Sequence, residues 1–176
     1  MGNRRPFTAD RQVQKRWSPP PPGSFKINVD GTFIPSSGAA TVGVVIRDHA
    51  GQAKLASWRV LSYCRDAEEA EATACREGIT LAAWWPETHM VLETDCAVVA
   101  AKLKNTYQDR SVDWSLVREA QIAMEELNSL DIVKIGRSQN NVAHELAHFA
   151  IRSGHSEVFF ASLPEFVLSL VCNGTP

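Results

Sequence analysis

The sequence lacks paired cysteines, a secretory leader and a long apolar run. Its four cysteines are scattered and form no CxxC pair; they are Cys64, Cys75, Cys96 and Cys172. This pattern favours free thiols in a reducing compartment. No apolar stretch approaches the ~18 residues of a membrane span. We therefore expect an intracellular monomer of the nucleus or cytoplasm that does not enter a membrane.

A strong net charge is also missing. The chain has 176 residues, which suits one compact domain with tails, and carries a formal charge of −2. This balance argues against a protein that binds nucleic acid by bulk charge alone. It does not exclude binding through divalent metal ions, because a bound cation inverts the local charge.

The ends of the chain differ in composition from its centre. Residues 1–16 hold five basic side chains against one acid, which predicts a disordered tail. The tail either helps to hold a nucleic-acid backbone, acts as a nuclear address, or is simply solvated. WSPPPPGS follows as a stiff linker. We expect a tail and linker over 1–24, a folded domain over 25–157, and an apolar C-terminal tail over 158–176, which covers a sheet edge or forms an interface.

The hydrophobic pattern between these ends predicts an α/β domain with a mixed sheet. Its first three strands form an antiparallel meander, and the last two join in parallel through helical crossovers, with helices on both faces. The predicted strands are 25–33, 39–47, 53–60, 89–94 and 131–136, and the predicted helices are 67–84, 96–104, 112–128 and 141–153.

Two aspartates follow predicted strands. Asp30 ends the first strand and Asp95 ends the fourth. If these strands are parallel neighbours, both carboxylates lie at one edge of the sheet, where ligands of α/β folds bind. Each aspartate taken alone is better explained as a turn residue or a helix N-cap.

Glu71 makes a functional reading of these acids more attractive. It shares a helix face with the small residues Ala74, Cys75 and Gly78, and no Lys or Arg stands three or four positions away. A carboxylate turned towards a sheet is costly unless a partner neutralises it. Asp30, Glu71 and Asp95 together suit an oxygen-ligated metal such as Mg²⁺. Two such ions can activate water against a phosphodiester.

The order of short motifs resembles the plant ribonuclease H-like domain, which occurs alone or at the end of retrotransposon-type reverse transcriptases. The motifs are W-x-P-P-P-x-G, K-I-N-V-D-G, G-V-V-I-R-D, A-E-A-x-A-x-x-x-G, E-T-D and N-x-x-A-H-x-L-A, and they span roughly residues 17–165. The resemblance implies a ribonuclease H-like fold with a five-stranded sheet. It also implies hydrolysis of the RNA strand of RNA–DNA hybrids with Mg²⁺ or Mn²⁺, with Asp30, Glu71 and Asp95 as catalytic metal ligands.

The sequence departs from active ribonucleases H at the start of the last helix. His144 stands where those enzymes carry a fourth acid, and an imidazole supplies no negative charge. We expect weaker binding of a second metal ion and weak activity. The alternative is a catalytically impaired domain that binds nucleic acid or protein. Arg137, Asn140 and Asn141 are candidate phosphate contacts, although an asparagine at a helix start is more often a cap.

Overall fold

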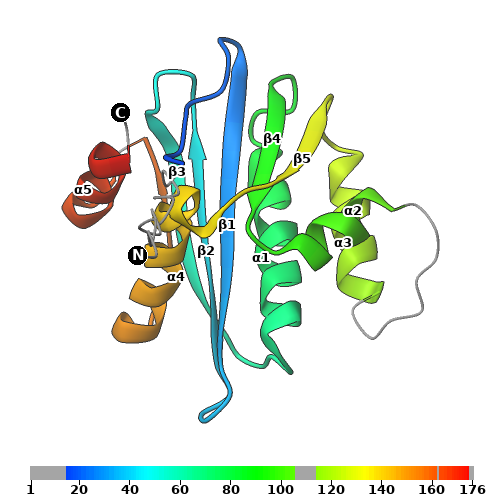
Figure 1. Cartoon of the computed structure of the whole chain (residues 1–176), viewed down its shortest axis with the longest axis vertical. Helices are drawn as coiled ribbons and strands as arrows, with labels where there is room; N and C mark the ends of the chain where they lie inside the picture. The colour runs from blue at the N-terminus through cyan, green and yellow to red at the C-terminus, as the bar shows by residue number, and fades with distance from the viewer. Residues whose placement is uncertain (1–14, 106–113, 162, 175–176) are drawn as a thin grey trace, which may run out of the picture.

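The computed structural model describes residues 15–105, 114–161 and 163–174 (Figure 1). All nine predicted helices and strands are present, with shifts of a few residues at their ends. Positions 112 and 113, where one helix was predicted to begin, lie outside the described residues. In chain order the elements are β1 (Ser24–Ile34), β2 (Ala39–Arg47), β3 (Ala53–Leu61), α1 (Ala67–Ala82), β4 (His89–Thr94), α2 (Ala97–Lys104), α3 (Trp114–Met124), β5 (Leu130–Lys134), the 3-10 turn η1 (Arg137–Gln139), α4 (Asn141–Ser153), β6 (Glu157–Phe160) and α5 (Glu165–Gly174).

The sheet has the order β5-β4-β1-β2-β3-β6. β1, β2 and β3 form the predicted antiparallel meander, and β4 and β5 extend it in parallel on the other side of β1. The predicted number of five strands is wrong, because β6 adds a sixth, antiparallel to β3. β6 is only four residues long, and a run as short as EVFF carries too little periodicity to be recognised as a strand.

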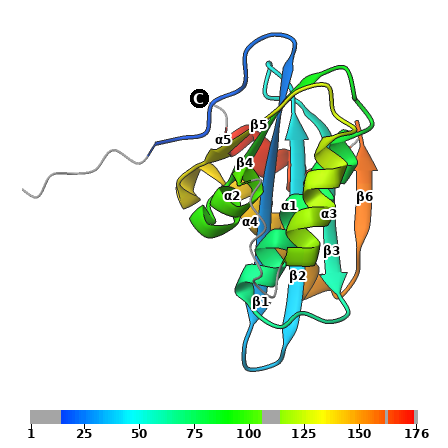
Figure 2. The same cartoon turned by 90° about the vertical axis from the view of Figure 1, so that its right-hand side faces the viewer.

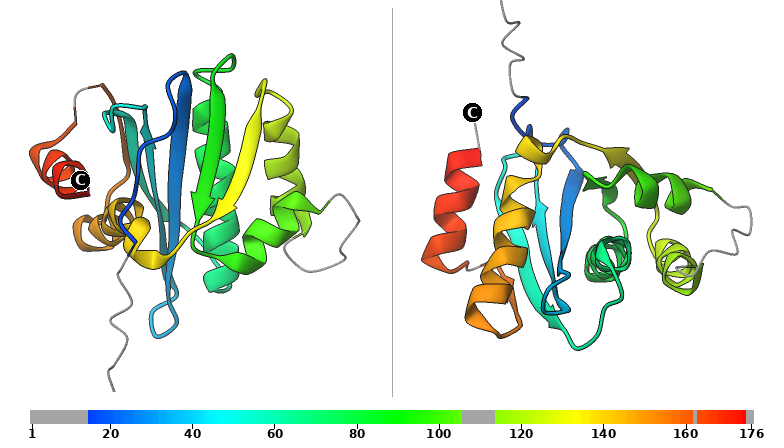
Figure 3. Two further views of the ribbon diagram at one scale, coloured as in Figure 1. Left: turned by 45° about the horizontal axis from the view of Figure 1, so that its top comes forward. Right: turned by 60° about the horizontal axis from the view of Figure 1, so that its bottom comes forward.

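Helices cover both faces of this sheet (Figures 1 and 2). α1 packs on β1 and β2, with α3 beside it, while α4 packs on the opposite face and α5 lies against α4 (Figure 3, right). Gly43 lets α4 approach β2 closely, because a Cβ atom there would collide with the backbone of Ala143 and Ala147. The first turn of α4 is therefore held close to the middle of the sheet.

Apolar side chains fill both layers. On the α1 side, Ile27, Val29, Val42 and Val44 alternate along β1 and β2 and face the small residues of the helix. On the α4 side, Trp58 is buried among aromatic rings and packs edge-on against Phe149. The alternation of strand residues between these two layers leaves Asn28 and Asp30 on the face opposite Ile27 and Val29.

Parts of both segments outside the predicted domain pack against the sheet and its helices. Trp17 is buried: its indole donates to Glu93 of β4, and the guanidinium of Arg47, at the end of β2, lies over its ring. At the other end, β6 covers the edge of β3, and α5 buries Val167 and Val171 against the α4 layer. The predicted basic tail lies outside the described residues up to position 14.

The described cysteines Cys64, Cys75 and Cys96 are free thiols, as predicted, while the side chain of Cys172 lies outside the described part. Among the described helices, none combines the length and the hydropathy needed to pass through a lipid bilayer.

Candidate metal centre

The parallel pairing of β1 with β4 places two aspartates side by side. Asn28 pairs with Glu93 in this register, so Asp30 and Asp95 each lie two residues further along the same direction. The two carboxylates therefore lie side by side, as the sequence predicted. Asp95 follows the end of β4, whereas Asp30 pairs with Gly43 inside β1, so the prediction that Asp30 ends its strand is wrong. Gly31 lets the third acid approach, since any Cβ at this position would collide with the backbone of Ala70 and Glu71.

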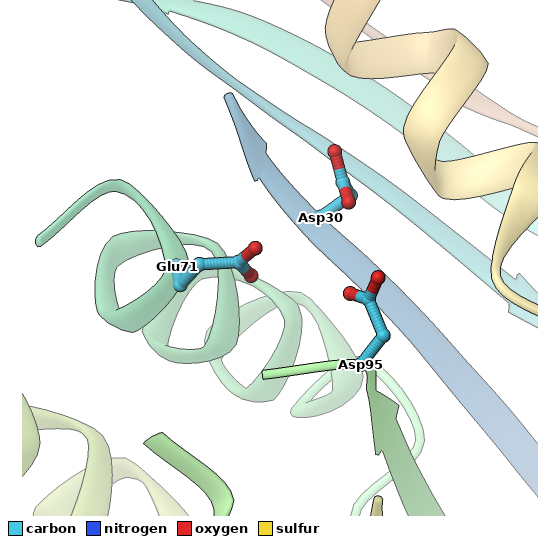
Figure 4. Close-up of side chains that lie close together, drawn as sticks. All are labelled: Asp30, Glu71 and Asp95. Carbon is cyan, nitrogen blue, oxygen red and sulfur yellow. The ribbon is translucent and has the colours of Figure 1, made fainter. Parts of the chain in front are cut away.

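Asp30, Glu71 and Asp95 converge from three elements (Figure 4). One ligand oxygen from each lies within 4.8 Å of the other two. Asp30 is 3% exposed, and the other two acids are half-buried. Acids exposed along a helix face or a loop are each solvated by water. These three instead converge on one small, partly buried space.

The clustered charges disfavour each other. The pKa of Glu71 is raised to about 8, chiefly by burial and then by the neighbouring carboxylates Asp30 and Asp95, against a backbone hydrogen bond from Gly31. Burial likewise raises the pKa of Asp30, although His144 acts in the opposite direction. A divalent cation among these oxygens would remove the repulsion, and an all-carboxylate donor set suits Mg²⁺ or Mn²⁺. The residues present thus fit such an ion.

His144 lies at the edge of this cluster on α4. Its Nδ1 is 3.3 Å from Oδ2 of Asp30, and its ring is 4.3 Å from the ring of His148. His144, which stands where the sequence comparison placed the fourth acid of active enzymes, is therefore adjacent to the three carboxylates. The imidazole pairs with one of them and adds no negative charge of its own.

Asn140 was predicted as a helix cap or a phosphate contact, and its bond to one of the acids was missed. It stands at the N-cap position of α4 but makes no side-chain capping bond, so the prediction of a capping role for it is wrong. Its Nδ2 instead donates to the carbonyl of Val29 at 2.7 Å and to Oδ1 of Asp95 at 3.3 Å. Arg137 also reaches this acid, with Nε 3.6 Å from Oδ2 of Asp95, and its side chain is 80% exposed. No local pattern in the sequence distinguishes such an asparagine from an ordinary cap.

A buried polar network lies beside the centre, and sequence reasoning missed it too. Glu93 accepts hydrogen bonds from the Trp17 indole and from Asn28, and pairs with Lys26 at 2.8 Å. Nη2 of Arg47 donates to Oδ1 of Asn28 at 2.7 Å. One signal was available: in a strand, Asn28 shares a face with Asp30, so a polar residue two positions before a buried acid indicates further polar structure.

The sequence matches the reverse transcriptase-like family over residues 28–150, and the chain belongs to that family. No curated protein matches the sequence. The family and its boundaries agree with the motifs from NVDG to the start of the last helix. They do not bear on a plant or retrotransposon origin, which stays a prediction.

Several solved ribonucleases H have a similar fold. RNase H1 of the halophilic archaeon Halobacterium salinarum NRC-1 aligns with a TM-score of 0.68 at 20% identity, over 74% of this chain and 99% of that one. LC11-RNase H1, isolated from compost and solved with an RNA/DNA hybrid, gives 0.65 at 23% identity, over 74% and 99%. The RNase H domain of prototype foamy virus gives 0.61 at 16%, over 74% and 97%. The predicted ribonuclease H-like fold is confirmed.

Proposed function

We propose that the protein is a metal-dependent endonuclease that hydrolyses the RNA strand of RNA–DNA hybrids. The observation that carries the proposal is the convergence of Asp30, Glu71 and Asp95 on one point, where β4 ends beside the middle of β1. The family and the structural similarity to ribonucleases H support it.

The roles of the residues follow from their positions. Asp30, Glu71 and Asp95 would hold Mg²⁺ or Mn²⁺, which supplies an activated water and stabilises the leaving oxygen of the phosphodiester. Asn140 fixes Asp95 by tying its carboxylate to the β1 backbone. Arg137 is exposed beside the acids and is placed to contact a substrate phosphate. His144 completes the site as the fourth catalytic residue, with less negative charge than an acid would bring.

Cleavage of an end-labelled RNA–DNA hybrid tests the proposal, in Mg²⁺ and separately in Mn²⁺. We expect weak cleavage that is faster in Mn²⁺, and a loss of about 100-fold or more in Asp95→Asn, since a bound ion contributes several kcal/mol to the transition state. Asp131→Asn is the matched control, because it removes an exposed carboxylate from β5. Equal rates in both variants would assign the cleavage to a contaminant.

The pairing of His144 with Asp30 favours a second candidate function, which is the binding of hybrids with little cleavage, because the imidazole adds no negative charge to the site. Absence of cleavage in both metals, with hybrid binding retained by the folded protein, is the result that would favour this alternative.

A further inference from the structure

A cavity of about 750 Å³ opens next to the metal centre, on the α4 side of the sheet. Its wall is formed by the segment before β1, the end of β2, η1 and the first turn of α4. Three arginines contribute to this wall, Arg16, Arg47 and Arg137, together with a single carboxylate, Glu145. The charge of the wall is therefore mainly positive, in a chain whose net charge is −2.

Arg47 is the unusual member of this wall. It is 1% exposed, and only its Nη2 has a hydrogen-bond partner; its Nε and Nη1 are buried without an acceptor among the described residues. The guanidinium lies 3.3 Å from the ring centroid of Trp17. A buried guanidinium with two unbonded nitrogen atoms is costly unless an acceptor satisfies their N–H groups.

The nearby acid does not fill this need. Glu93 already accepts from Trp17 and Asn28 and pairs with Lys26. Its carboxylate therefore compensates two cations, Lys26 and Arg47, and leaves a surplus of one positive charge in the buried network.

The start of α4 adds further donors to the same cavity. Asn141 and Val142, its first residues, line the cavity, and no side chain caps this 13-residue helix. Free N–H groups and the helix dipole favour an anion at such an end. The uncapped helix and the unsatisfied Arg47 are independent observations that point to the same kind of ligand.

We propose that this cavity binds one phosphate of the nucleic-acid backbone, while the neighbouring phosphodiester of the same strand lies at the metal centre. The proposal rests on the proposed function. It is favoured over a free anion because the two sites share walls: His144 contacts Asp30 and lines the cavity, and Arg137 pairs with Asp95 and lines it too. A polynucleotide strand is the ligand that presents phosphates to both at once.

Hybrid binding without metal tests this separately from catalysis. The full chain is titrated with a fluorescent RNA–DNA hybrid in a chelator, so that the result does not depend on cleavage. Arg16→Gln removes an exposed arginine of the wall and is expected to weaken binding by about 3- to 10-fold. Arg152→Gln is the control, since it makes the same charge change at a position about 16 Å along α4 from Asn141, which lines the cavity. It is expected to change binding by less than about 2-fold.

The side chain of Arg47 is followed directly, because its Nε–H gives a separate ¹⁵N–¹H resonance that Arg47→Lys removes. We expect this signal to shift with the hybrid and with inorganic phosphate, and phosphate to compete with the hybrid. Equal weakening by Arg16→Gln and Arg152→Gln would show a bulk charge effect and overturn the proposal. An Arg47 signal that responds to neither ligand, or to inorganic phosphate alone, would overturn it as well. Absence of cleavage in a separate assay would contradict the nuclease and leave this binding result valid.

Discussion

The Nδ1 atom of His144 on α4 lies 3.3 Å from Oδ2 of Asp30 on β1. This contact places the imidazole where it moderates the pKa of a buried acid that burial otherwise raises. A neutral or cationic ring at this position weakens the attraction of the site for a divalent ion, compared with a fourth carboxylate.

We expect His144→Asp to increase hydrolysis of the hybrid in Mg²⁺ by about 10-fold or more, because the new carboxylate adds negative charge beside Asp30. Without metal the variant should be less stable than the parent, since four carboxylates then repel one another. The measurement is the initial cleavage rate against Mg²⁺ concentration. His144→Asn, which removes the imidazole without adding charge, is the control. An equal increase in both variants would show that the imidazole merely obstructs the site.

Divalent metal should stabilise the native fold through the same three acids. At a Mn²⁺ concentration 100 times the Kd, the gain is about 2.7 kcal/mol, which raises the Tm by about 5 to 10 °C. Asp95→Asn should fold normally and lose this gain, while Asp131→Asn should keep it. Thermal unfolding with and without metal gives the comparison. A parent protein whose Tm stays constant at millimolar Mn²⁺ contradicts the metal centre.

The raised pKa of Glu71 predicts how stability depends on pH without metal. The folded state retains the proton on Glu71 up to about pH 8, whereas the unfolded chain loses it near pH 4.5, the ordinary pKa of a glutamate side chain. The native state therefore binds more protons between these values, and the free energy of unfolding decreases as pH rises through this window. The contribution of the protonated Glu71 to the free energy of unfolding is present below about pH 4.5 and lost above about pH 8.

Glu71→Gln should remove this dependence, which we expect to amount to about 2 to 4 kcal/mol. Urea unfolding at several pH values, in a chelator, measures it. The exposed Glu126 offers the control Glu126→Gln. Parallel pH profiles for the parent and Glu71→Gln would show that the carboxylate is ionised in the folded protein across the whole range.

Two adjacent asparagines at the start of α4 should respond differently to substitution. Asn140 is 1% exposed and donates to Val29 and Asp95, whereas Asn141 is exposed. Asn140→Ala should destabilise the fold by about 1–3 kcal/mol, because the Val29 carbonyl loses its donor. Asn141→Ala should cost less than about 0.5 kcal/mol.

The same pair distinguishes a positioning role from a purely structural one. Asn140→Ala should also weaken Mn²⁺ binding, since the carboxylate of Asp95 is no longer oriented, and Asn141→Ala should not. Calorimetric titration with Mn²⁺ at a temperature where both variants are folded provides the measurement. Unchanged Mn²⁺ affinity in Asn140→Ala would limit this residue to a structural role.

Much of the centre could be predicted because strand periodicity and connection rules are local. If the first and fourth strands pair in parallel, Asp30 and Asp95 lie side by side whatever the packing details. Glu71 followed from the small residues on its helix face and from the absence of a basic neighbour on that helix. These inferences need only the direction of a strand and the period of a helix.

Other features depended on contacts between segments far apart in the sequence. Whether Asn140 caps its helix or holds Asp95 is decided by the approach of α4 to β1, which the glycine at position 43 permits. Trp17 reads as part of a polar, Pro-rich linker, yet it is buried over Arg47 because the end of β2 presents a guanidinium there.

The sequence by itself determined the α/β class, the antiparallel meander followed by two parallel strands, and the identity of the three clustered acids, since all three depend on periodicity and chain direction. Only the tertiary structure decided the sixth strand, the contact of His144 with Asp30, and the arginine-lined cavity beside the acids. Those features are sums of weak contacts between distant segments, and no single segment carries a signal for them.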